Sequence, residues 1–133
     1  LEQARKAGKV RLLGVSCQNP EHAIACFNQG WVDAIQITIN FARQGAIDAV
    51  LPYAMERGIA VVARQPFSGG ALTRLPTDEH GLSADQAALQ FMMRVKGVAV
   101  VLAGITDQNH LDRNIEILAL PQMTDTTYEA FRR

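Results

Sequence analysis

Residues 59–70 read IAVVARQPFSGG, an apolar, β-branched run that gives way at once to a turn-rich segment. The run is typical of a buried strand, and the proline and glycines after it open a loop that extends to Leu82. Apolar residues at helical spacing precede the strand, and Gly58 ends them. After the loop, Ser83 and Gln86 stand at the spacing of a capping box, which marks the start of another helix. The stretch therefore predicts a strand held between two helices.

The same alternation of strand and helix extends through the rest of the chain. Helix starts are expected at Asn19, at Thr106 or Asp107, and at Thr124. Strands that alternate with helices form a parallel sheet with right-handed crossovers, and ligands of such folds bind in the links after the carboxyl ends of the strands. We expect four strands, near residues 10–15, 34–40, 59–63 and 98–103.

Two architectures fit this order, a doubly wound open sheet and half of a (β/α)8 TIM barrel. A dinucleotide-binding open sheet requires a glycine-rich turn after its first strand, but residues 16–20 read SCQNP. The glycines instead follow the third and fourth strands, as Gly69, Gly70 and Gly104, and barrels often hold phosphate at their last two strand–helix loops. The predicted fold class is therefore α/β, of the (β/α)8 TIM-barrel type, here a half barrel of four parallel βα units.

The length agrees with a half barrel. A complete TIM barrel needs roughly 200 residues or more, and this chain has 133. The chain does not begin with methionine, so we expect a fragment or a processed product. Residues 1–133 are expected to form a single domain.

Composition and charge exclude several classes of function. The formal net charge is zero and there is no basic run, which argues against nucleic-acid binding. No apolar stretch reaches the roughly 20 residues of a membrane span, and the charged N-terminus does not resemble a secretion signal, so we expect a cytoplasmic protein. Cys17 and Cys26 do not suggest a disulfide framework, and His22, His80 and His110 lack metal-ligand spacing. No metal site is predicted.

Four motifs, in chain order, resemble segments of the aldo-keto reductases. They are residues 8–16, GKVRLLGVS; Gln36 with Asn40; residues 63–70, ARQPFSGG, with Leu72; and Gly104 followed by Leu111 and Asn114. In that family they would be the fifth to eighth barrel strands with their loops. The resemblance implies the C-terminal half of the barrel, and thus the cofactor-binding half of an NAD(P)H-dependent oxidoreductase that interconverts carbonyls and alcohols by hydride transfer.

The resemblance implies a role for several residues at the nicotinamide end of a cofactor. Ser16 and Gln36 would hydrogen-bond the nicotinamide carboxamide. Arg64, at a position that is frequently aromatic in the family, would stack on the nicotinamide ring through its planar guanidinium. An asparagine often follows the serine in the family, whereas Cys17 stands here. The loop over the pyrophosphate would be formed by Gln65, Phe67 and Gly69, because glycine lets backbone N–H groups approach an anion closely.

The eighth strand and its helix would hold the adenosine end of the cofactor. Asn114 matches the residue that reads the adenine edge. Gly104 and His110 stand where many members use a lysine and an arginine to grip the 2′-phosphate. We expect NADP(H) as the cofactor and NAD(H) as the alternative, bound weakly or not at all by this half alone.

No catalytic residue is assigned. The family reduces carbonyls with an Asp, Tyr, Lys and His set that lies on the first half of the barrel, and Tyr53 and Tyr128 fall in predicted helices. The chain alone is therefore expected to be inactive, and the small-molecule carbonyl substrate belongs to the complete enzyme. Gly14-Val15-Ser16 also resembles a hydrolase nucleophile elbow, but Gln18 replaces the second glycine of that motif.

A non-catalytic role is the main alternative, either as a half-barrel interaction or assembly module or as the product of a truncated gene. A half barrel would leave two apolar strand edges unpaired, along residues 10–15 and 98–103. The inner face of the sheet would also be open, with Leu12, Ile35 or Gln36, Val61 and Val101 on it. The predicted partner is therefore another half barrel, either the missing segment or a second copy in a homodimer.

Overall fold

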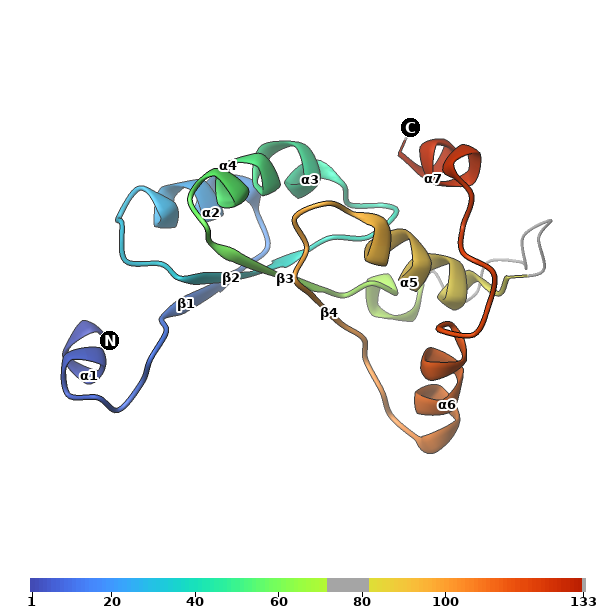
Figure 1. The fold of residues 1–133 in the computed structure, drawn as a ribbon, viewed down its shortest axis with the longest axis horizontal. Coiled ribbons are helices and arrows are strands. Elements are labelled where there is room, and N and C mark those ends of the chain that lie inside the picture. Colours follow the sequence, from blue (N-terminus) through green and yellow to red (C-terminus); the bar gives the residue numbers. More distant parts are fainter. Residues whose placement is uncertain (72–81, 133) are drawn as a thin grey trace.

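The computed structural model describes residues 1–71 and 82–132 and shows four strands that alternate with helices (Figure 1). The strands form one parallel sheet in the order β1-β2-β3-β4. The prediction of four parallel βα units is confirmed. Part of the predicted loop between residues 64 and 82, including Leu72 and His80, lies outside the described residues. The elements are α1 (Glu2–Lys6), β1 (Gly14–Cys17), α2 (Pro20–Phe27), β2 (Ala34–Thr38), α3 (Gly45–Ala49), α4 (Leu51–Glu56), β3 (Ala60–Arg64), the 3-10 turn η1 (Ser68–Gly70), α5 (Ala84–Arg94), β4 (Val100–Leu102), α6 (Gln108–Glu116) and α7 (Asp125–Phe131).

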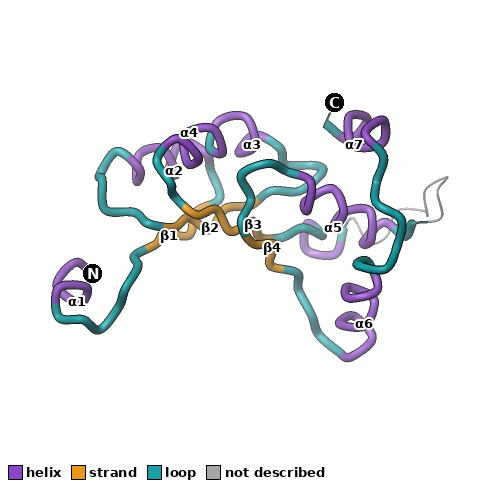
Figure 2. Tube along the Cα trace, viewed as in Figure 1, coloured by secondary structure: helices purple, strands orange, loops and turns teal. Residues whose placement is uncertain are grey.

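The helices cover one face of the sheet. α2 packs on β1 and β2, α4 on β3, and α5 on β4. Figures 1 and 2 show α1 and α6 at the two ends of this arc of helices, and no described element lies over the opposite face between them. The strand side chains that point toward the helices form the core and are buried, among them Ile35, Ile37, Val61 and Ala63. The sheet is therefore covered on one side and open on the other.

The open face carries different side chains from those predicted. Successive strand residues point to opposite faces, so Gln36, Val62 and Val100, which are in register across three strands, share the open face. Val61 is buried, and Val101 packs against the helix-covered core. The prediction that Val61 and Val101 lie on the open face was wrong, because a strand that is apolar on both faces does not reveal which face the helices cover.

β1 begins at Gly14 rather than at Val10. The carboxylate of Asp33 accepts a hydrogen bond from the Leu13 N–H at 2.8 Å, so a side chain takes the place of a ladder partner there. Gly14 itself is required by close approach, since a Cβ atom on it would lie 2.9 Å from the Ala34 carbonyl oxygen. The apolar run of residues 10–15 therefore begins before the strand itself.

Most helix starts follow the local sequence. The side chain of Asp107 accepts from a backbone N–H in the first turn of α6, and that of Thr124 does the same in α7. The capping box is present before α5, where the Ser83 N–H donates to Oε1 of Gln86 at 3.1 Å. Asn19 occupies the cap position of α2 as predicted, but its side chain makes no capping hydrogen bond.

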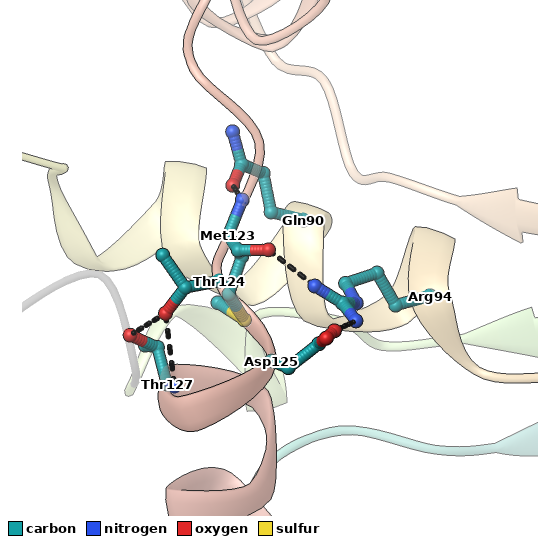
Figure 3. A network of polar contacts seen from close by, with 6 residues as sticks. All are labelled: Gln90, Arg94, Met123, Thr124, Asp125 and Thr127. Atoms are coloured by element: carbon teal, nitrogen blue, oxygen red, sulfur yellow. Dashed lines mark hydrogen bonds and ion pairs between the residues drawn. The ribbon is translucent and has the colours of Figure 1, made fainter.

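A polar network ties the C-terminal segment to α5 (Figure 3). The buried amide of Gln90 donates to the Pro121 carbonyl at 2.8 Å and accepts from the Met123 N–H at 2.5 Å. Arg94 donates to the Met123 carbonyl and to the Asp125 carboxylate. These bonds fix the turn before α7 and hold that helix beside α5, away from the open face of the sheet.

Candidate functional site

A pocket of about 680 Å³ opens where β3 and β4 end. Its walls are the loop after β3, the first turn of α5 and the α6 segment. Parallel α/β folds bind ligands at this end of their strands, which makes the pocket the candidate site. The structure brings seven of the nine residues singled out from the sequence into its lining: Arg64, Gln65, Phe67, Gly69, Gly104, His110 and Asn114.

The backbone after β3 has an unusual conformation. Gln65 and Ser68 have positive φ angles of 57° and 50°, although neither is glycine, and Gly69 follows at 67°. The side chain of Asn40 donates to the Gln65 carbonyl at 2.9 Å, and Thr38 Oγ1 donates to Gln65 Oε1 at 3.1 Å. Such strained residues persist only where the surroundings hold them. The end of β2 therefore shapes the β3 wall of the pocket.

Among the described residues of the pocket, two buried hydrogen-bond donors lack a hydrogen-bond partner. They are Nε of Arg64, at the end of β3, and Nδ2 of Asn114, on α6. Buried polar groups in folded proteins are nearly always hydrogen-bonded, so each exception calls for an explanation. Both donors belong to residues that line the same pocket, which fits a ligand that brings acceptors to both walls.

The start of α6 forms a second polar wall. The His110 N–H donates to the Asp107 carboxylate at 2.9 Å, and this bond holds the pKa of Asp107 below its ordinary value. Nδ1 of His110 lies 2.7 Å from Thr106 Oγ1 and 3.3 Å from Asp107 Oδ2. The imidazole is therefore held by its own helix start, with Thr106 and His110 in the pocket lining.

An ion pair in the lining was missed by the sequence analysis. Arg113 Nη2 lies 2.8 Å from Oδ1 of Asp85, and both residues line the pocket. Arg113 could have been noticed from its spacing, because it stands three residues after His110 on the same helix, and residues three apart share a helix face. No spacing in the sequence links Asp85 to these residues, because Asp85 reaches the site only through the packing of α5 on α6.

Ser16 and Gln36 lie outside the pocket lining. They are paired in register on β1 and β2, with Ser16 exposed and Gln36 half-buried. Gln36 is in register with Val62, two residues before Arg64, so Gln36 and Arg64 share the open face of the sheet. The Ser16–Gln36 pair and Arg64, which lines the pocket, therefore lie on the same face of the sheet.

The described part of the pocket contains no tyrosine and no lysine. The Tyr53 hydroxyl lies 2.5 Å from Oδ1 of Asn28, and the ring of Tyr128 stacks on Phe91 at 5.3 Å between centroids. Within residues 1–71 and 82–132 there is no cluster of three metal-ligating side chains. No helix in this part of the chain is long and apolar enough to cross a membrane.

A family model for the aldo/keto reductases matches residues 1–79, which is more than half of the chain. The chain belongs to the aldo/keto reductase family. The resemblance inferred from the four motifs is thereby confirmed. A search among curated proteins found no match.

Solved aldo-keto reductases share this fold. Two of them are the holo and apo forms of aldo-keto reductase AKR11C1 from Bacillus halodurans, with TM-scores of 0.83 and 0.82 and 19% sequence identity in each case. The similarity covers 98% of this chain but 52% and 53% of those chains. The chain thus spans about half the length of the aldo-keto reductases that it matches, and the predicted fold class, part of a (β/α)8 barrel, is confirmed.

Proposed function

We propose that this chain is the C-terminal, cofactor-binding half of an NAD(P)H-dependent aldo-keto reductase, and that residues 1–133 form one domain of that enzyme. The observation that carries the proposal is the pair of unpartnered donors, Arg64 Nε and Asn114 Nδ2, in one pocket. A buried donor without an acceptor costs about 1–3 kcal/mol. An adenine dinucleotide offers acceptors to both, as phosphate and amide oxygens and as adenine ring nitrogens.

The lining suits the successive parts of such a cofactor. Asn114 would donate to the adenine edge, and Gly104 and His110 would lie beside the adenosine ribose. Gln65, Phe67 and Gly69 would cover the pyrophosphate. At Gly69 the space for a Cβ atom is empty to 4 Å and φ is positive, so the backbone there is open to a close anion.

The nicotinamide end would lie along the open face of the sheet. Arg64 would stack on the ring, and Ser16 and Gln36 would hydrogen-bond its carboxamide. When bound, the cofactor supplies the hydride that converts a carbonyl to an alcohol. This chain would hold and orient it, whereas the proton donor and the carbonyl substrate site would come from the other half of the barrel. We expect no carbonyl reduction by this chain alone.

An assembly role is the second candidate. Val100 and Leu102, on the open face, are 47% and 44% exposed, and large contiguous apolar patches on a surface mark sites of protein interaction. The partner would be another half barrel, either the complementary segment or a second copy. We also propose a cytoplasmic location, in which the free thiols of Cys17 and Cys26 would stay reduced.

Isothermal titration of the 133-residue chain with NADH, NADPH and 2′,5′-ADP tests the cofactor proposal. We expect saturable binding by at least one nucleotide. Replacing Asn114→Ala should weaken it about 5–10-fold, because one hydrogen bond to the ligand is lost. Asn109→Ala is the matched control, since this asparagine lies on the same helix, is exposed and is not part of the pocket lining.

Two outcomes would contradict the proposal. One is the absence of heat with all three nucleotides at millimolar concentration. The other is an equal loss of affinity in the Asn109 and Asn114 variants, which would show that the change acts on helix stability rather than on a ligand contact.

A further inference from the structure

The Asp85–Arg113 ion pair joins two helices at the wall of the pocket. Asp85 stands in the first turn of α5 and Arg113 in the second half of α6, and their charged atoms lie 2.8 Å apart. The Asp85 side chain is only 13% exposed, and its Oδ1 also accepts from Ser83 Oγ at 2.5 Å. The carboxylate is therefore fixed in place, and Arg113 is held on it rather than free in solvent.

This pair leaves the α6 wall without an uncompensated positive charge. Arg113 is balanced by Asp85, and the imidazole of His110 has the Asp107 carboxylate at 3.3 Å from its Nδ1. Among the described lining residues, the cation without an ion-pair partner is Arg64, on the opposite wall at the end of β3. Positive charge available to a ligand is thus concentrated at one end of the pocket.

An extra phosphate on the adenosine ribose would approach the negative charge of Asp85, which lies against α6. A phosphate monoester carries close to two negative charges above its second pKa of about 6. At the α6 wall it would face the Asp85 carboxylate, which accepts from Nη2 of Arg113 and offsets the positive charge of that side chain. The balanced pair therefore attracts a phosphate less than an unpaired arginine would. A nucleotide without this phosphate does not need that attraction.

We infer that Asp85 is a specificity-determining residue which, by holding Arg113, makes the pocket favour an adenine nucleotide without a 2′-phosphate. The inference rests on the proposed function, because it concerns the same pocket. It selects NAD(H) over NADP(H), the reverse of the preference expected from the sequence. It also names Arg113 as a phosphate ligand whose attraction for the anion increases when Asp85 is neutralised.

The test compares 5′-AMP with 2′,5′-ADP, which differ only by the 2′-phosphate, in titrations at pH 8. The unmodified chain should bind 5′-AMP more tightly. Asp85→Asn, which preserves the size of the side chain, should improve the affinity for 2′,5′-ADP relative to 5′-AMP about tenfold, since the positive charge of Arg113 is then no longer offset by a carboxylate. Arg113→Gln should shift the ratio in the opposite direction, because the Asp85 charge is then uncompensated.

Asp112→Asn serves as the control, since it removes the same charge from an exposed position of α6 that is bonded to Gln108. The ratio of affinities should stay within twofold in that variant. If Asp85 only braces α5 against α6, Asp85→Asn and Arg113→Gln will change both ligands alike and the ratio will not move, which overturns the inference while nucleotide binding stands. Absence of binding by both ligands to the unmodified chain would overturn the inference and the proposed function together.

Discussion

At the scale of single residues, Asn40 links two strands and sets the shape of the pocket wall. It is 1% exposed, and its Oδ1 accepts from the N–H groups of Ala42 and Arg43, both at 3.0 Å. Its Nδ2 donates to the Gln65 carbonyl at 2.9 Å, where the chain takes its left-handed turn. One amide therefore satisfies three backbone groups on two loops.

Replacing Asn40→Ala should lower the free energy of unfolding by about 2–3 kcal/mol, because the Gln65 carbonyl and the Ala42 N–H lose the partner that the buried Asn40 side chain provides. Chemical denaturation measures the change. Asn19→Ala is the control, since this side chain is exposed and makes no capping bond, and it should cost less than about 0.5 kcal/mol. A loss of similar size in both variants would mean that the Asn40 network does not stabilise the fold.

The positions of site residues could be predicted from the sequence only where topology determines them. Arg64 ends β3, Gly69 lies in the loop after it, and Gly104 comes two residues after β4. The carboxyl ends of parallel strands share one edge, so the meeting of these residues could be foreseen. The Asp85–Arg113 pair could not, because it depends on how α5 and α6 pack and on the directions of two long side chains. The unpaired state of Arg64 Nε and Asn114 Nδ2 is likewise a property of the folded pocket.

At the scale of elements, helix starts were easier to predict than strand ends. A cap is a local contact, and the side chains of Asp107 and Thr124 form theirs within three residues. A strand end depends on a partner elsewhere in the chain. β1 stops pairing before Gly14 although Val10 and Leu12 are apolar, since β2 begins at its register partner Ala34. Apolar runs therefore located the strands but overestimated three of them, β1 at its start, β2 at its end and β4 at both ends, and placed β3 one residue early.

At the scale of the whole molecule, the open sheet face and α6 expose several large apolar side chains. Val100 is 47% exposed on β4, and Ile115 and Leu118 are 55% and 73% exposed on and after α6. Burying such side chains is worth about 1.5–3 kcal/mol each. The sequence could indicate that one face of the sheet would be open. It could not indicate which residues would line that face, because the strands are apolar on both faces.

We expect the chain to associate through this face at micromolar concentration, so light scattering should give a mass above the 14.5 kDa of the monomer. Val100→Glu should weaken the association, because a charge would have to be buried. Met93→Glu is the matched control, since Met93 is 58% exposed on the helix-covered side, on α5. A stable monomer with a cooperative melt would show that the face needs no partner.

The most direct test of the central claim is a solution NMR titration of the chain with NADH. If the pocket between the β3 and β4 loops binds the nucleotide, the backbone amide signals of Gly69 and Gly104 and the side-chain amide of Asn114 should shift together along one saturable curve. The amides of Gly30 and Gly58, which lie outside the pocket lining, should stay in place. Shifts scattered over the chain without saturation, or none at Asn114, would contradict the account.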